Sequence, residues 1–248
     1  MTKNYKFSNV LIVIPARLKS TRLKRKLLLK IHGYPVIYWT VSQVRKSNLA
    51  KFIVATDSQE IKQVCDQYGF PVEMTSENCT NGTERVYEVA RKYKNDFKFF
   101  MNVQADEPLL NVQIIEQLLY SIGVNDFSFK TAVSKISKSN PNNSSEVKVA
   151  MSLDNRIRYA SRCLIPFFRD QAKENIFKIH GVYLYPIKIL EKFVGSQEGI
   201  LESIEKVEQL RCIEHDIPLY GIITPGSFNS VDTKDDFEMY ENLKFHFN

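Results

Sequence analysis

The chain has 248 residues, 44% of them hydrophobic and 25% charged, which are the proportions of an ordinary globular protein. Its four cysteines form no CxxC or CxxH pair, so the sequence argues against a zinc site or a disulfide framework and indicates a reducing, cytoplasmic environment. No apolar stretch approaches the roughly 20 residues of a membrane span. The net charge of +6 is concentrated in one short segment, which suits a small polyanion better than a nucleic acid.

Apolar strands and amphipathic helices alternate through the first half of the chain. We expect strands at residues 10–14, 51–55, 71–74 and 97–103, and helices at 35–44, 60–68, 83–93 and 111–121. Ser58 is a suitable N-cap for the second of these helices, and Gly69 a suitable end. This alternation predicts an α/β fold with a doubly wound, mixed but mostly parallel sheet.

The second half is more varied. We expect strands at 130–136, 147–151, 177–185 and 218–223, and helices at 187–193, 200–214 and 233–245. No repeat or linker composition separates the two halves, so the sequence predicts one domain over residues 1–248. Within it, about 125–175 would project as a smaller arm that pairs subunits.

Asp106 follows the apolar residues 99–101 and lies two residues after Gln104. A carboxylate at the end of a buried strand is costly unless it is paired, hydrogen-bonded or bound to a metal. Open α/β sheets bind their ligands at the carboxyl ends of their strands. We therefore expect this corner to bind a metal ion and a ligand.

A dense cationic loop follows the first predicted strand, with seven Lys or Arg and no Asp or Glu between residues 17 and 30. Phosphates bind at this position of an α/β sheet. Arg offers bidentate contacts to phosphate, and Lys a mobile point charge. The loop matches neither the P-loop nor the dinucleotide-binding pattern, so it predicts another kind of phosphate site, with a solvated run of charges as the alternative.

Six ordered motifs, spread over essentially the whole chain, resemble those of the CMP-KDO synthetases, the 3-deoxy-manno-octulosonate (KDO) cytidylyltransferases. They are Ile14-Pro15-Ala16-Arg17-x-x-Ser20-x-Arg22-Leu23-x-x-Lys26, Ala55-Thr56-Asp57-Ser58, Gly82-Thr83-Glu84-Arg85, Asn102-Val103-Gln104-Ala105-Asp106-Glu107-Pro108, Leu201-Glu202-x-x-Glu205-x-x-Glu208-Gln209-Leu210-Arg211 and Val231-Asp232-Thr233. The resemblance implies a nucleotide-diphospho-sugar-transferase fold, CTP and a 3-deoxy-ulosonic acid as substrates, Mg²⁺ as cofactor, and a homodimer.

The resemblance also implies roles for individual residues. The catalytic residues would be Arg17, Lys26, Asp106 and Asp232, and the metal ligands Asp106 and Asp232. The nucleotide would contact Ala16, Arg17, Lys19, Arg22, Lys26, Arg85 and Gln104. The sugar would contact Gln104, Arg162, His180, Tyr183, Glu208 and Gln209.

Three of these residues have an alternative role. Asp232 precedes a predicted helix and is a suitable N-cap for it. Arg85 has Glu84 and Glu88 as alternative partners. His180 is displaced by one residue from the family's H-x-G-x-Y pattern, which on a strand turns a side chain to the other face. Either a bulge re-aims His180, or the sugar contact differs.

We expect a nucleotidyl transfer in which the anomeric hydroxyl of the acceptor attacks the α-phosphorus of CTP and yields a CMP-sugar and pyrophosphate. One alternative is activation of an amino-substituted or longer, sialic-acid-like ulosonic acid, which the displaced His180 motivates. The other is a non-catalytic relative that only binds nucleotide or sugar. The sequence does not distinguish a product for lipopolysaccharide from one for capsule.

Overall fold

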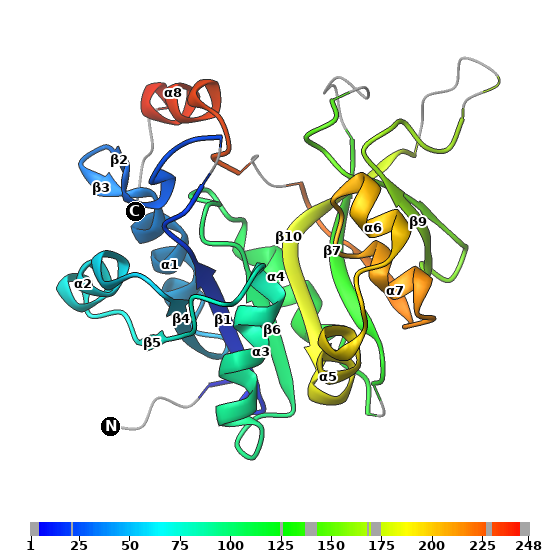
Figure 1. Ribbon diagram of the computed structural model, residues 1–248, viewed down its shortest axis with the longest axis horizontal. Coiled ribbons are helices and arrows are strands. Elements are labelled where there is room, and N and C mark those ends of the chain that lie inside the picture. Colours follow the sequence, from blue (N-terminus) through cyan, green and yellow to red (C-terminus); the bar gives the residue numbers. More distant parts are fainter. Residues whose placement is uncertain are drawn as a thin grey trace. The chain divides into compact units, whose positions relative to one another are not determined.

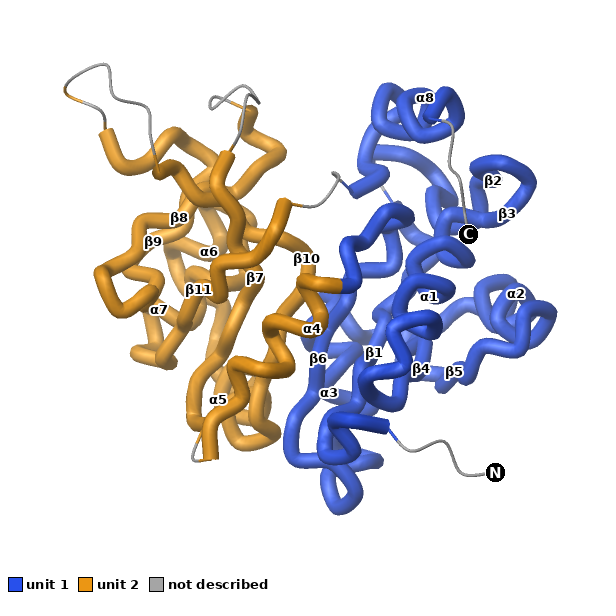
Figure 2. Tube along the Cα trace, turned by 180° about the vertical axis from the view of Figure 1, so that it is seen from behind, with its two compact units in different colours: residues 1–112, 227–248 blue, residues 113–226 orange. Residues whose placement is uncertain are grey.

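The computed structural model describes residues 5–20, 22–124, 126–136, 143–167, 169, 175–226 and 230–243. The chain forms two compact units, one of residues 1–112 with 227–248 and one of residues 113–226, coloured separately in Figure 2. Among the described residues, no helix is long and apolar enough to cross a membrane. The predicted subunit-pairing role of residues 125–175 stays a prediction.

Unit 1 is built on a parallel sheet with the strand order β5–β4–β1–β6 (Figure 1). These strands are β1 (Val10–Ala16), β4 (Lys51–Thr56), β5 (Val72–Met74) and β6 (Phe99–Val103). Strand β1 is buried along its whole length, as its unbroken apolar sequence predicts. It lies between β4 and β6, so that Ile14 pairs with Val54 and Val13 with Asn102.

The helices of unit 1 connect these strands. They are α1 (Val36–Ser47), α2 (Gln59–Tyr68), α3 (Gly82–Tyr93) and α8 (Lys234–Asn242). From β1 to β5 the strand order advances in one direction, and from β5 to β6 it returns past β1. Because such crossovers are right-handed, α3 covers the face opposite α1 and α2. The reversal makes the carboxyl ends of β1 and β6 a topological switch point, where open α/β sheets bind ligands.

Local signals set the ends of α2 as predicted. The Ser58 side chain accepts a hydrogen bond from the Ile61 N–H, and Gly69 ends the helix with φ of 64°. The sequence prediction missed a small hairpin of β2 (Lys30–Ile31) and β3 (Tyr34–Pro35). Its turn residues, His32 and Gly33, both have positive φ, as a two-residue hairpin turn requires. The 3-10 helix η1 (Lys26–Leu28) precedes this hairpin.

Unit 2 contains a mixed sheet. Its elements are α4 (Val112–Tyr120, whose first residue belongs to unit 1), β7 (Phe129–Lys135), β8 (Lys148–Met151), β9 (Ile157–Ser161), β10 (Phe177–Pro186), α5 (Ile187–Gly195), α6 (Ile200–Glu205), α7 (Leu210–Glu214) and β11 (Leu219–Ile223). Strand β7 pairs in parallel with β11 and antiparallel with β10, and β8 joins β10 to β9. The sequence prediction missed β9. The expected α/β fold with a mixed, mostly parallel sheet is confirmed.

The long helix expected at 200–214 is wrong, because the chain forms α6 and α7 with a break between them. Lys206 adopts a left-handed conformation with φ of 52° and ends α6. Arg162 donates from Nε to the Glu205 carbonyl at 2.8 Å and from Nη2 to the Lys206 carbonyl at 3.2 Å. These are carbonyls that a continuing helix would bond to its own N–H groups, so the guanidinium takes the place of the next turn.

Candidate active site

Asp106 and Asp232 lie at the carboxyl edge of the unit 1 sheet, and backbone bonds hold both there. The peptide before Asp106 is fixed because Thr40 Oγ1 donates to the Ala105 carbonyl at 2.9 Å. The Val231 N–H donates to the Asp106 carbonyl at 2.9 Å, so the segment that enters α8 runs beside Asp106. Two carboxylates from distant parts of the chain are thereby brought to one place.

The alternative role of Asp232 as a helix cap is wrong. Thr233 is the N-cap of α8 and forms a capping box with Asp236. The Asp236 carboxylate also accepts from the Asp232 N–H at 3.1 Å. The side chain of Asp232 therefore takes no part in the cap, and its Oδ2 accepts from Ser230 Oγ at 3.1 Å.

The ammonium of Lys26 lies between the two carboxylates. Its Nζ donates to Asp106 Oδ2 and, at 2.8 Å, to Asp232 Oδ1. Arg22 Nη2 adds a second cation 3.0 Å from the same oxygen of Asp232. Two negative and two positive charges cancel, so the cluster formed by Arg22, Lys26, Asp106 and Asp232 is neutral as it stands.

Charge pairing outweighs burial in setting the pKa values of Lys26 and Asp232. Burial alone would lower the pKa of Lys26, but the charges and hydrogen bonds of Asp106 and Asp232 raise it overall. Burial alone would raise the pKa of Asp232, but Lys26 and then Arg22 hold it below its ordinary value. Lys26 therefore stays protonated and Asp232 ionised at neutral pH.

The remainder of the cationic loop divides between this site and α2. Arg17 Nη1 donates to the Thr80 carbonyl at 3.4 Å, across from the start of α3. Arg25 forms a paired contact with Glu60 of α2, in which Nη1 lies 3.1 Å from Oε1. Lys19 is exposed, as are Arg17 and Arg22. The loop thus offers three exposed cations, of which Arg22 shares the Asp232 carboxylate with Lys26.

Gln104 and Ala16 follow or end the neighbouring strands β6 and β1, so both lie at the switch point. Ala16 is fully buried and presents backbone. A Cβ added to Gly82, the first residue of α3, would lie 3.3 Å from Gln104 Nε2 and 3.4 Å from Pro15 Cγ. The start of α3 therefore closes against the side chain of Gln104, and a side chain at position 82 would displace it.

Arg85 lies in the interior of unit 1. It is 2% exposed, and its Nη2 forms an ion pair with Asp57 Oδ2 at 2.9 Å. The alternative partners Glu84 and Glu88 are engaged instead with the loop before α3. Arg85 thus joins the turn after β4 to that loop, and a direct nucleotide contact for it stays a prediction.

In unit 2, Arg162 is held by three backbone carbonyls. Besides its bonds to residues 205 and 206, its Nη1 donates to the Ser144 carbonyl at 2.9 Å. The buried ammonium of Lys148 donates to the carbonyl of Arg162 itself at 2.9 Å. These bonds orient the guanidinium firmly, and its predicted contact with the sugar carboxylate stays a prediction.

His180 lies in β10, where the pairing with β7 changes register. The register against β7 shifts between Ile179 and Tyr183, so the pairing is irregular around His180, and whether this re-aims the histidine towards the sugar stays a prediction. The His180 side chain is 6% exposed, and its Nε2 lies 2.7 Å from Ser134 Oγ. Burial, with a smaller effect of Lys178, lowers its pKa to about 4. His180 is therefore a neutral imidazole at pH 7, and its sugar contact stays a prediction.

The other proposed sugar contacts of unit 2 occupy different settings. Tyr183 is half-buried, with its ring edge-on to Phe129 at a centroid distance of 5.9 Å. Gln209 is 6% exposed and directly precedes α7, and Glu208 is half-buried beside it. Because α6 ends at residue 205, Glu208 does not share a helical face with Glu205, as it would in the continuous helix expected at 200–214.

The donor set of the acidic pair fits a magnesium ion. Mg²⁺ is bound in proteins by one or two carboxylates, retained waters and substrate phosphate oxygens. Asp106 and Asp232 already converge on one cationic nitrogen, so both can face one ion. Within the described part of the chain, no three His, Cys, Asp or Glu residues gather as a metal site, so water and phosphate would supply the other ligands.

Sequence reasoning gave Thr80 no role and Glu84 only a possible pairing with Arg85, whereas Thr80 and Glu84 contact each other, and the Thr80 carbonyl accepts from Arg17. A signal for them was present. Asn81 with Glu84 three residues later is a helix-start pattern, and it falls directly before the apolar face of α3. What the pattern does not reveal is which loop the carboxylate reaches.

The chain matches known proteins over nearly its whole length. A family model described as cytidylyltransferase matches residues 11–219, which together with the fold and the acidic and cationic groups defines the protein as a cytidylyltransferase. The 3-deoxy-manno-octulosonate cytidylyltransferase of Acidobacterium capsulatum is 37% identical over 237 residues, which are 95% of this chain and 96% of that protein. The enzyme of the same name from Koribacter versatilis is 38% identical and covers 93% of this chain and 88% of its own.

A solved structure agrees with these relatives. The structure of CMP:2-keto-3-deoxy-manno-octonic acid synthetase complexed with CTP is similar with a TM-score of 0.87 and 30% identity, over 94% of this chain and 97% of that one. The chain belongs to the 3-deoxy-manno-octulosonate cytidylyltransferase family, as its six motifs predict.

Proposed function

We propose that this protein transfers the cytidylyl group of CTP to 3-deoxy-manno-octulosonate, forming the CMP-sugar and releasing pyrophosphate. The observation that carries the proposal is the convergence of Asp106 and Asp232 beside Arg22 and Lys26 at the switch point of the unit 1 sheet. The relatives named for this reaction and the CTP-bound synthetase support both substrates.

The cationic loop supplies the triphosphate contacts of this proposal. Arg17, Lys19 and Arg22 are exposed, Arg22 lies beside Asp232, and the three hold the β- and γ-phosphates. Lys26 can exchange an aspartate for a phosphate oxygen, because its ammonium is already at the site. These cations offset the charge that develops on departing pyrophosphate, and such positioning and neutralisation are what phosphoryl transfer needs most.

We propose Asp106 and Asp232 as the residues that hold Mg²⁺. When bound, the ion neutralises phosphate charge and lowers the pKa of the attacking hydroxyl. The chain fixes the geometry of these ligands: the Val231 N–H ties the Asp232 segment to the Asp106 carbonyl, and the capping box of α8 keeps the Asp232 carboxylate out of the helix cap.

The acceptor contacts are the sugar-binding part of the proposal. They are Gln104, Arg162, His180, Tyr183, Glu208 and Gln209. Arg162 uses three N–H groups on carbonyls, and a guanidinium has five, so two can meet the sugar carboxylate. Neutral His180 suits a sugar hydroxyl better than an anion. The homodimer and the cytoplasmic location also belong to this proposal, and sedimentation of the purified protein tests the former.

A pyrophosphate-release assay that crosses four nucleoside triphosphates with several ulosonic acids tests the proposal. We expect the highest kcat/KM for CTP with 3-deoxy-manno-octulosonate in the presence of Mg²⁺. A higher value with an amino-substituted or longer acid would transfer the assignment to that acceptor. Binding of CTP in calorimetry without pyrophosphate from any acid would contradict the proposal and support a non-catalytic relative.

A further inference from the structure

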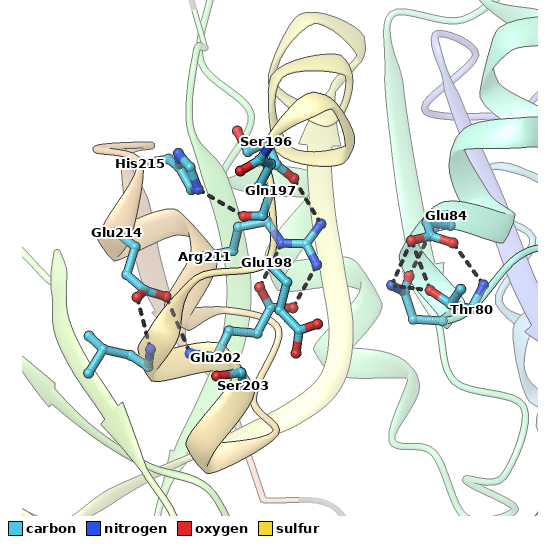
Figure 3. Close-up of polar contacts among 12 residues, drawn as sticks. Thr80, Glu84, Ser196, Gln197, Glu198, Glu202, Ser203, Arg211, Glu214 and His215 are labelled. Carbon is cyan, nitrogen blue, oxygen red and sulfur yellow. Dashed lines mark hydrogen bonds and ion pairs between the residues drawn. The ribbon is translucent and has the colours of Figure 1, made fainter.

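The carboxylate of Glu84, in the first turn of α3, holds the residue Thr80 on the loop that precedes the helix (Figure 3). Glu84 Oε2 accepts from the Thr80 N–H at 2.7 Å, and Oε1 accepts from Thr80 Oγ1 at 2.9 Å. The Asn81 side chain, which caps the helix, donates to Oε1 at 3.2 Å. One carboxylate thus collects three donors from two consecutive residues.

This arrangement differs from a capping box. In a capping box the third helical residue bonds back to the N–H of the cap residue itself. Here Asn81 is the cap, and Glu84 reaches one residue further, to Thr80. The helix start is satisfied by Asn81, so the bonds from Glu84 fix the loop rather than the helix.

The carbonyl of Thr80 accepts from Arg17 Nη1 at 3.4 Å. The three groups therefore form a chain: the Glu84 carboxylate, the Thr80 residue, and the Arg17 guanidinium. A loop residue whose N–H and hydroxyl are held by a carboxylate presents its carbonyl in a fixed direction, and bonds in such a chain strengthen one another. The negative charge of Glu84 thereby supports the orientation of Arg17 without a direct ion pair being needed.

The same turn also sets the position of Gln104. Gly82 follows Asn81 directly, and the space beside its Cα is closed by Gln104 Nε2, 3.3 Å from an added Cβ, and by Pro15. Shifting the 80–82 turn therefore moves both Arg17 and Gln104, the two residues that flank the expected nucleotide position at the switch point.

We propose that Glu84 is a positioning residue for nucleotide binding, which acts through Thr80 on Arg17. The proposal rests on the proposed function because it takes Arg17 to contact the triphosphate. Under this proposal, loss of the Glu84 carboxylate changes the free energy of CTP binding more than it changes the free energy of unfolding.

Calorimetric titration of the full chain with CTP and Mg²⁺ tests the proposal. We expect Glu84→Gln to weaken CTP binding about tenfold, because an amide cannot accept from both donors of Thr80. In the pyrophosphate assay, KM for CTP should rise by a larger factor than kcat at saturating CTP falls. Thr80→Val, which removes only the hydroxyl bond, lowers affinity by a smaller factor and serves if Glu84→Gln folds poorly.

Glu88→Gln is the matched control. Glu88 lies one turn further along α3, and its Oε2 accepts a hydrogen bond from the Ser76 N–H of the same loop at 2.9 Å. Its CTP affinity should equal that of the parent protein. In a double-mutant cycle, Glu84→Gln should cost less in an Arg17→Ala background than in the parent protein, and only the part that acts through Gln104 should remain. The proposal would be overturned if Glu84→Gln bound CTP as tightly as the parent protein, or if Glu88→Gln lost as much CTP affinity as Glu84→Gln. It would also be overturned if the effects of Glu84→Gln and Arg17→Ala on CTP binding were additive. Failure of the parent protein to bind CTP would instead overturn the proposed function.

Discussion

Lys26 donates hydrogen bonds from its ammonium to Asp106, one of the two carboxylates proposed to hold Mg²⁺, and with the same nitrogen to Asp232. A single positive charge thus lies where a divalent ion is proposed to bind. An ion that arrives alone must displace it, whereas a triphosphate offers the ammonium another partner and the ion additional ligands. Metal and nucleotide should therefore bind with strong positive coupling.

This relationship predicts the effect of removing the ammonium. In Lys26→Met, two carboxylates face only Arg22, so Mn²⁺ should bind the nucleotide-free protein about tenfold more tightly than it binds the parent. Electron paramagnetic resonance of free Mn²⁺ measures this directly. Lys24→Met removes the same charge from an exposed neighbour and is the control. Equal Mn²⁺ affinity in the two variants would show that Lys26 does not compete with the ion.

The acidic pair should be essential for turnover and dispensable for folding. We expect Asp106→Asn and Asp232→Asn each to reduce kcat about a hundredfold or more, since each removes a charge that is proposed to hold the ion facing the reacting phosphate. Far-UV circular dichroism should be unchanged. Asp235→Asn, on the exposed first turn of α8, is the control and should retain the parent's kcat. Near-full activity of Asp106→Asn at saturating CTP and Mg²⁺ would remove Asp106 from the mechanism.

The sequence predicted much of this site because its signals are local or follow from strand direction. An apolar strand followed by cations, and another followed by an acid, must bring Arg17 and Asp106 to the same edge if both strands are parallel neighbours. That Asp232 joins them was implied only by the family resemblance, because the bond from the Val231 N–H to the Asp106 carbonyl links segments distant in the chain.

The sequence predictions that were wrong or incomplete depend on contacts between segments distant in the chain. The residues of α6 and α7 have continuous helical character, and the break at Lys206 depends on Arg162, which comes from the end of β9. Strand β9 was itself missed, since its pairing with β8 rather than any apolar alternation defines it. The sequence also left open whether a bulge falls near His180, because register along a strand is decided by the neighbouring strands.

Buried His180 predicts a loss of stability in acid. Its pKa is about 4 in the folded chain and near 6.5 when unfolded, so between these values the unfolded chain binds more protons. The contribution of neutral His180 is complete above pH 6.5 and disappears as the pH falls towards 4. The difference corresponds to about 3 kcal/mol. Urea unfolding between pH 4 and 7 should therefore show a weaker pH dependence in His180→Gln than in the parent, and equal dependences would contradict the assignment.

Arg211 and Glu202 form a buried ion pair between α7 and α6 (Figure 3). Nε and Nη2 of Arg211 each lie 2.7 Å from one carboxylate oxygen, and the two side chains are 7% and 6% exposed. The guanidinium also lies over the Phe193 ring, 4.8 Å from its centroid. Breaking such a pair leaves a charge buried without compensation, while replacing both partners removes the charge altogether.

We therefore expect Arg211→Met to lower the free energy of unfolding by about 3–5 kcal/mol, because the Glu202 carboxylate stays buried while methionine preserves much of the packing. The double variant Arg211→Met with Glu202→Leu should recover most of this loss. Glu198→Ala breaks an exposed ion pair, in which the Glu198 side chain is 52% and the Lys206 side chain 72% exposed. It should change the free energy of unfolding by less than about 1 kcal/mol. Urea denaturation followed by circular dichroism measures all three. If the double variant is no more stable than Arg211→Met alone, the stabilisation comes from packing around Phe193 and not from pairing of the charges.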